Sequence, residues 1–267
     1  IGLTDTNGLY GAIRFIEQAK QQGLRPILGA ELTVDDHRTL LLAKTPEGYA
    51  NLCRVLSERH CDPTFDCIAS ISHYRNGLIL ITDDEEALVA WRKESPQDLY
   101  AELTPGPAMH RMLLFSRRTG LPPVATNRTY FAKPDDFETH RLLRAIALNT
   151  TLSRLPAQAC CAPTQWLLPP ARMAEQFPHV PEALENTVRI AETCHSDWRF
   201  SKAGTDDFRA LMETQTPLKL ARFFDRWILG STIPRIRVTP RIEGDGKSAT
   251  VRIEQLGDVF DFPLTVV

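Results

Sequence analysis

The stretch that most constrains the fold is residues 1–32, because it reads as a strand, a turn, a helix and a second strand. The helix is predicted by apolar residues that recur at the spacing of one helical face: Leu9, Ala12, Ile13, Ile16 and Ala19. Asp5 or Asn7 is the expected cap of that helix. A strand–helix–strand unit of this kind is a right-handed parallel crossover. In such units the chemistry lies at the carboxyl ends of the strands, which here carry Asp5, Thr6 and Glu31.

Strand and helix patterns alternate through residues 1–150, which predicts an α/β fold with a parallel sheet or barrel. Residues 78–82 form a continuous apolar run, as expected of a central strand. Residues 135–148 predict an amphipathic helix whose apolar positions are Phe137, Leu142, Leu143 and Ile146. Residues 60–72 show no regular pattern, and we expect irregular structure there.

Composition excludes few classes of protein. The chain has 267 residues and a net charge of −2. Domains that bind nucleic acid directly are usually basic, so the overall charge does not indicate such a domain. Its six cysteines do not form a disulfide framework, and no apolar run is long enough to predict a transmembrane helix. We therefore expect a cytoplasmic protein without membrane contact. The chain begins at Ile1, and we expect it to be a cut from a longer protein.

Several sequence blocks carry a family resemblance. TDTNGLYGAIRF, GLRPILGAEL, LLLAKTPEGYANLCRVLS, NGLILIT, PPVATN, FAKPDDFETHRLLRAI and PEALENTVRIAETC occur in this order. They resemble the PHP (polymerase and histidinol phosphatase) domain of bacterial DNA polymerase III alpha subunits and error-prone DNA polymerases. The resemblance covers residues 1–197. It implies an incomplete PHP-type (β/α) barrel that lacks its first strand.

The resemblance also implies which residues could bind metal. The family's first ligands form a His-x-His pair on a strand that would precede Ile1. Glu31 matches a family ligand, whereas Thr6, Arg128 and Tyr130 stand where the family has other ligands. We therefore expect no catalytic residue, no bound cofactor and a metal-degenerate site, with Glu31 the sole candidate ligand. Zinc, manganese or magnesium is expected only if the site is intact after all.

Two further groups of residues are candidate sites. The possible zinc ligands His60, Cys61, Cys67 and His73 do not have the spacing of a standard zinc motif. The basic residues Arg117, Arg118, Arg141 and Arg144 are the best candidate patch, and a solvated helix face is the simpler interpretation.

The sequence changes character after a junction at residues 198–203. Residues 204–267 resemble the C-terminal region of metallo-aminopeptidases related to aminopeptidase N, where a helix leads into a β-sandwich. We expect a helix containing Phe223, Phe224, Trp227 and Ile228, followed by a small antiparallel β unit. No His in the chain is followed by Glu, so the zinc motif HExxH of such peptidases is absent.

We therefore interpret the chain as a fragment of a DNA polymerase III alpha-type or error-prone polymerase, which would act in DNA replication or repair synthesis. In this interpretation the PHP domain is structural. The parent family is a DNA-directed nucleotidyltransferase, and its polymerase active site is absent from this chain. Its expected partners are the polymerase body or other replication subunits, with DNA contacted only indirectly. Two alternatives stay open: a metal-dependent PHP phosphoesterase, and a non-enzymatic remnant or interaction module.

Overall fold

The computed structural model describes residues 1–34, 37–194, 205–215, 217–230, 235–242 and 249–257. The chain divides into two compact units, Ile1–Trp198 and Arg199–Val267. The junction expected at residues 198–203 lies outside the described residues.

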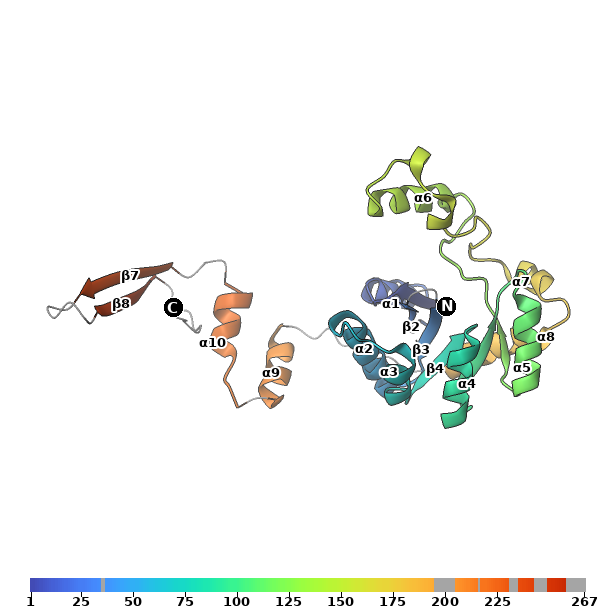
Figure 1. The fold of residues 1–267 in the computed structure, drawn as a ribbon, viewed down its shortest axis with the longest axis horizontal. Coiled ribbons are helices and arrows are strands. Elements are labelled where there is room, and N and C mark those ends of the chain that lie inside the picture. The colour runs from blue at the N-terminus through green and yellow to red at the C-terminus, as the bar shows by residue number, and fades with distance from the viewer. Residues whose placement is uncertain (35–36, 195–204, 216, 231–234, 243–248, 258–267) are drawn as a thin grey trace. The chain divides into compact units, whose positions relative to one another are not determined.

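The first unit is built on a six-stranded sheet whose strands follow one another in chain order (Figure 1). The strands are β1 (Gly2–Thr6), β2 (Ile27–Val34), β3 (His37–Ala43), β4 (Leu78–Thr82), β5 (Leu99–Leu103) and β6 (Pro123–Ala125). The β1–β2, β4–β5 and β5–β6 pairs are parallel, whereas β3 runs antiparallel to both β2 and β4. The expected parallel pairing is therefore present in three strand pairs, and the sheet is mixed because both pairs made by β3 are antiparallel. The connection from Val34 to His37 is too short for a parallel crossover, which needs about a dozen residues or more.

Helices connect these strands and extend the unit. They are α1 (Ala12–Gln21), α2 (Pro46–Cys61), α3 (Cys67–His73), α4 (Glu85–Glu94), α5 (Met109–Thr119), α6 (Asp136–Ala147), α7 (Pro170–Gln176) and α8 (Pro181–Thr193), with short 3₁₀ turns at Leu152–Arg154 and Ala157–Ala159. Apart from α6, which stands away from the sheet, they gather around it (Figure 1).

The two faces of the sheet pack in different ways. One face belongs to the larger core, where Leu41, Leu80 and other strand residues meet helix residues such as Leu52 and the fully buried Trp91. The other face, called the inner face below, carries a smaller apolar cluster: Ile27, Leu40, Leu42, Ile79, Ile81 and Val124, joined by Ile190 and Cys194 at the end of α8. Polar side chains on the inner face therefore lie beside apolar neighbours.

The sequence also predicts a helix that Thr45 caps, with Pro46 at its first position, and a helix over residues 108–119 that ends at Gly120, and the structure confirms these ends. The hydroxyl of Thr45 accepts a hydrogen bond from the amide of Gly48, so it caps α2, and Pro46 is the first helical residue. Gly120 ends α5 with φ of 72°, a left-handed conformation that suits glycine.

Other local expectations are corrected. Helix α1 begins at Ala12 without a side-chain cap, although Asp5 Oδ2 accepts a hydrogen bond from the Gly11 amide at 2.6 Å. The stretch expected to be irregular contains α3, which Asp66 caps. The apolar positions of α6 are not a buried stripe, because Leu142, Leu143 and Ile146 are 48%, 59% and 66% exposed. A helical pattern shows which residues share a face, but only tertiary packing decides whether that face is covered.

The second unit contains helices followed by a β-hairpin-like pair of strands. Its elements are α9 (Thr205–Gln215), α10 (Ala221–Phe223), the π-helical η3 (Phe224–Ile228), β7 (Arg235–Ile242) and β8 (Ala249–Leu256). Strands β7 and β8 pair antiparallel in a separate two-stranded sheet, which agrees with the expected small antiparallel unit. In the expected apolar helix, Phe224 is buried, whereas Phe223, Trp227 and Ile228 are exposed. The sequence also predicts a hairpin turn at 244–246 and a strand at 260–266, and both lie outside the described residues.

Candidate functional site

The register of the sheet brings charged side chains together near the carboxyl ends of its parallel strands. Glu31 on β2 pairs directly with Thr6 on β1 and with Leu40 on β3, so these three side chains share the inner face. Because side chains alternate along a strand, Arg38, two residues before Leu40, points to the same face. The register continues from Leu40 through β4 to Tyr100 on β5, and Glu102 follows two residues later. Glu31, Arg38 and Glu102 therefore meet, although they are far apart in sequence.

The guanidinium of Arg38 lies between two buried carboxylates. Its Nε donates to Glu31 Oε2 at 2.5 Å, and its Nη1 donates to Glu102 Oε2 at 2.5 Å. The side chains of Glu31 and Glu102 are 7% and 0% exposed, and that of Arg38 is 10% exposed. One cation thus neutralises two carboxylates on two strands, a geometry that suits the fork of donors on arginine.

Hydroxyl groups satisfy the remaining carboxylate oxygens. Glu31 Oε1 accepts hydrogen bonds from the hydroxyls of Thr6 and Tyr130, both at 3.1 Å. Glu102 Oε1 accepts one from the hydroxyl of Thr126 at 2.6 Å. Every carboxylate oxygen of the pair therefore has at least one donor, as buried charges require.

A second guanidinium, that of Arg128, lies beside these residues and has fewer hydrogen-bond partners than Arg38. Arg128 Nη2 contacts Asp83 Oδ2 at 2.5 Å and Glu102 Oε2 at 3.5 Å. Its side chain is 27% exposed, its φ of 45° is unusual for a residue other than glycine, and its buried Nε finds no hydrogen-bond partner among the described residues. Arg128 therefore adds charge at the rim, whereas Arg38 occupies the centre. We call Arg38, Glu31 and Glu102, with Thr6, Thr126, Tyr130 and Arg128 around them, the arginine-bridged site.

Burial and charge shape the acid–base properties of this site. Burial alone would lower the pKa of Arg38, but the charges of Glu102 and Glu31 and their hydrogen bonds raise it above its usual value. Burial, and then the charge of Glu31, raise the pKa of Tyr130. Arg38 is therefore a permanent cation, and Tyr130 stays protonated as a hydrogen-bond donor.

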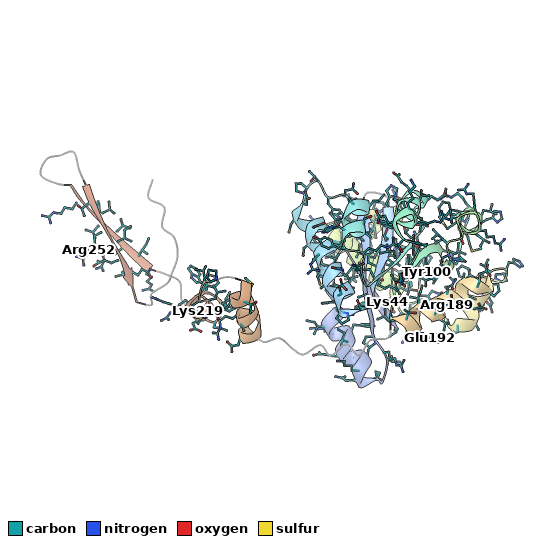
Figure 2. The ribbon with its side chains drawn as sticks, turned by 90° about the horizontal axis from the view of Figure 1, so that it is seen from below. Lys44, Tyr100, Arg189, Glu192, Lys219 and Arg252 are labelled. Atoms are coloured by element: carbon teal, nitrogen blue, oxygen red, sulfur yellow. The ribbon has the colours of Figure 1, made fainter. Side chains whose placement is uncertain are left out.

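A cavity of about 650 Å³ opens beside the arginine-bridged site. Arg38, Glu31, Arg128 and Tyr130 line one part of it, and β1 with apolar side chains such as Phe15 and Leu167 lines the rest. At the other end of the inner face, Tyr100 lies near Lys44 and Arg189 (Figure 2). There Lys44 forms an ion pair with Asp98 at 3.0 Å, and burial, followed by the charge of Asp98, raises the pKa of Tyr100.

Comparisons with known proteins agree on the first part of the chain. The family model described as the PHP domain matches residues 1–103. The error-prone DNA polymerase of Symbiobacterium thermophilum is 31% identical over 238 residues, which covers 73% of this chain and 22% of the relative. The DNA polymerase III subunit alpha of Pseudomonas aeruginosa is 28% identical over 243 residues (78% and 21%), and that of Haemophilus influenzae is 31% identical over 229 residues (73% and 20%).

Residues 1–103 match the PHP domain, and the chain is homologous to these polymerases over part of its length. It spans about a fifth of the length of the curated relatives it matches. These matches give no support to the aminopeptidase resemblance of residues 204–267, which stays a prediction.

The residues present do not fit the metal centre that the PHP family implies. In the described part of the chain, no three His, Cys, Asp or Glu side chains converge as metal ligands would. Glu31 and Glu102 face each other, but the guanidinium of Arg38 lies between them and Arg128 also approaches Glu102. A divalent ion placed there would be repelled by two fixed cations. The candidate ligand Glu31 instead receives its hydrogen bonds from Thr6, Tyr130 and Arg38.

Among the other candidate ligands, the two histidines have structural contacts of their own. His60 Nε2 lies 2.7 Å from the carbonyl oxygen of Asn7, and the ring of His73 contacts that of Tyr74 edge-on. Burial, followed by the charge of Asp66, raises the pKa of Cys67 to about 12. That thiol is therefore a poor source of the thiolate that zinc prefers.

The candidate basic patch is divided between α5 and α6. Arg118 stacks on the ring of Phe115 and also approaches Glu85, Arg141 pairs with Glu138, and Arg144 donates to the carbonyl oxygen of Ala159. Arg118 and Arg141 thus each have a carboxylate nearby, whereas the contact of Arg144 with a carbonyl oxygen leaves its charge in place. No described helix has the length and apolar character needed to cross a membrane.

Sequence reasoning missed Arg38 and Glu102, the two residues that complete the site. Residues 34–38 read as a polar turn in the sequence, whereas Arg38 belongs to β3. The available signal was alternation: in β5, Leu99, Ala101 and Leu103 are buried on one face, and the intervening Glu102 is a charge inside an apolar strand. Such a carboxylate almost always has a partner, but the sequence alone does not say which.

Proposed function

We propose that the first unit is the PHP portion of a bacterial DNA polymerase III alpha-type or error-prone polymerase, and that its role is structural. Homology to these polymerases, over a fifth of their length, supports the parent family. The observation that carries the structural role is the guanidinium of Arg38, held between the buried carboxylates Glu31 and Glu102. In this proposal the domain supports the polymerase body or other replication subunits during cytoplasmic DNA replication or repair, and it contacts DNA only indirectly.

The competing function is a metal-dependent phosphoesterase. Metal-ion catalysis needs a cation with an open coordination position that activates water or polarises the phosphoryl group. The charge arrangement described above opposes such a cation, so we do not favour this alternative.

A chimaeric polymerase tests the structural role. The segment of the Symbiobacterium thermophilum error-prone polymerase that aligns with residues 1–194 is replaced by those residues, and primer extension is measured. We expect a soluble chimaera that extends primers at a rate close to that of the parent, while deletion of the same segment abolishes extension. A soluble chimaera without extension would contradict the proposal.

A hydrolysis assay tests the alternative on the 267-residue chain itself. We expect no release of p-nitrophenol from bis-p-nitrophenyl phosphate with manganese, zinc or magnesium present. Activity that requires added metal and disappears in Glu31→Ala would instead establish the phosphoesterase.

For the second unit, we propose the aminopeptidase-like identity predicted from its sequence, without catalytic activity. The order of helices followed by the β7–β8 pair agrees with that assignment but is too simple an arrangement to identify a family. Cleavage of an aminopeptidase substrate such as leucine p-nitroanilide by the chain would contradict the proposed absence of catalytic activity.

A further inference from the structure

We propose that the guanidinium of Arg38 occupies the position between Glu31 and Glu102 where a divalent cation would otherwise bind. Removal of the Arg38 side chain would then allow these two carboxylates to bind a divalent ion. This inference concerns only the arginine-bridged site and does not depend on the polymerase assignment.

The first step is the charge balance. Glu31 and Glu102 are almost fully buried, and Arg38 is the one group among the described residues that contacts both. Without it, two buried carboxylates, with Asp83 nearby, would face a single cation, Arg128. Removal of one partner from a buried ion pair leaves an uncompensated charge, which is strongly destabilising. A cation is therefore required at this position for the sheet to remain intact.

The second step is the chemistry of the donors. Around the guanidinium stand carboxylate oxygens from Glu31 and Glu102 and hydroxyl oxygens from Thr6, Thr126 and Tyr130. Carboxylate and other oxygen donors are those that magnesium, calcium and manganese prefer. Two different nitrogens of one planar guanidinium, Nε and Nη1, contact Glu31 and Glu102, so the two carboxylates lie on either side of that one group. Removal of the guanidinium would leave the carboxylates facing each other across the space it fills, and a divalent ion there would compensate both charges.

The third step distinguishes Arg38 from Arg128. Arg128 approaches Glu102 only at 3.5 Å, and its main partner Asp83 is 34% exposed. Loss of Arg128 would therefore leave Glu31 and Glu102 still bridged by Arg38. Arg128→Ala is the matched control: it removes the same chemical group from the same site without opening the position between the two carboxylates.

Manganese binding by the full chain tests the proposal, with free Mn²⁺ measured by its electron paramagnetic resonance signal and stability by thermal unfolding. We expect Arg38→Ala to bind one Mn²⁺ and to gain several degrees in melting temperature with millimolar Mn²⁺. Wild type and Arg128→Ala should do neither, and EDTA should leave the melting temperature of wild type unchanged. Binding of Mn²⁺ by wild type that Glu31→Gln abolishes, or a folded Arg38→Ala that binds none, would overturn the proposal.

A triple variant covers the case in which Arg38→Ala does not fold. Arg38→Ala with Glu31→Gln and Glu102→Gln removes the cation and both negative charges together. We expect this variant to regain a cooperative unfolding transition and to bind no Mn²⁺, because it carries no uncompensated charge. A triple variant no more stable than Arg38→Ala alone would show that charge balance is not the role of Arg38.

Discussion

At the scale of single residues, the inner face of the sheet carries a buried ionic group in which every carboxylate oxygen of Glu31 and Glu102 accepts a hydrogen bond. Arg38 bridges Glu31 and Glu102, and three hydroxyls supply the remaining donors. Burial of charged groups is costly, and the cost is offset only when pairing and hydrogen bonding are both satisfied. Each member of the arginine-bridged site therefore depends on the others, and the effects of substitutions within it should not add independently.

Tyr130 provides a test of this dependence through pH. Its pKa is raised, by burial first and then by the charge of Glu31, so the folded state holds the phenol proton more tightly than the unfolded state. The stability that Tyr130 contributes is therefore complete below about pH 10, the unperturbed value, and is lost as the pH rises through the folded-state pKa. Because Tyr130 is 45% exposed and water screens its contact with Glu31, we expect Tyr130→Phe to lower the free energy of unfolding by about 0.5–1 kcal/mol at pH 8, with a difference from wild type that shrinks at higher pH.

Denaturant unfolding at a series of pH values from 8 to 11 measures this difference. Tyr10→Phe is the control, because the side chain of Tyr10 is 80% exposed. A Tyr130→Phe deficit that grows with pH would contradict the assignment of Tyr130 as the proton donor to Glu31.

At the scale of elements, close backbone contacts fix how helices join the sheet. Gly48, in the first turn of α2, lies against the turn that precedes β4, where a β-carbon on Gly48 would stand 1.8 Å from the carbonyl oxygen of Gly77. Gly77 itself has φ of 73°, which glycine adopts without strain. The position of α2 relative to β4 therefore depends on the absence of a side chain at Gly48.

We expect Gly48→Ala to lower the free energy of unfolding by about 1–3 kcal/mol or more, since the added methyl group meets backbone that cannot rotate away. Gly2→Ala is the matched control, because a β-carbon there makes only ordinary contacts, the nearest at 3.7 Å. Denaturant midpoints of the two variants give the comparison. Equal stability of Gly48→Ala and wild type would mean that α2 shifts freely against the turn.

At the scale of the whole molecule, the chain divides into two compact units. The apolar clusters of the first unit draw all their residues from the portion before residue 195. In the second unit, β7 pairs only with β8 among the described strands. Each unit has internal contacts of its own, and we expect the two to behave as independent domains.

Limited proteolysis tests this division. We expect trypsin to cut first between Ser196 and Gly204, where Arg199 and Lys202 supply cleavage sites, and to leave a fragment of residues 1–199 or 1–202 that resists further digestion. Intact mass measurement of the early products identifies the site. First cleavage within α2 to α5 would show that the first unit does not form a stable core in the full chain.

The sequence by itself determined the features that depend on near neighbours. The cap at Thr45, the end of α5 at Gly120 and the buried strand at 78–82 follow from forces acting within a few residues. Family resemblance also placed Glu31, Thr6, Arg128 and Tyr130 in one site, and the structure brings these four together.

Only the tertiary structure decided the direction of β3, the exposure of α6 and the partner of Glu31 and Glu102. Arg38 and Glu102 are separated by 64 positions in the chain. Their contact arises because strand register aligns residues from β2, β3 and β5 on one face. A pattern within one strand shows which side chains share a face, but the register between strands is set by packing across the whole sheet.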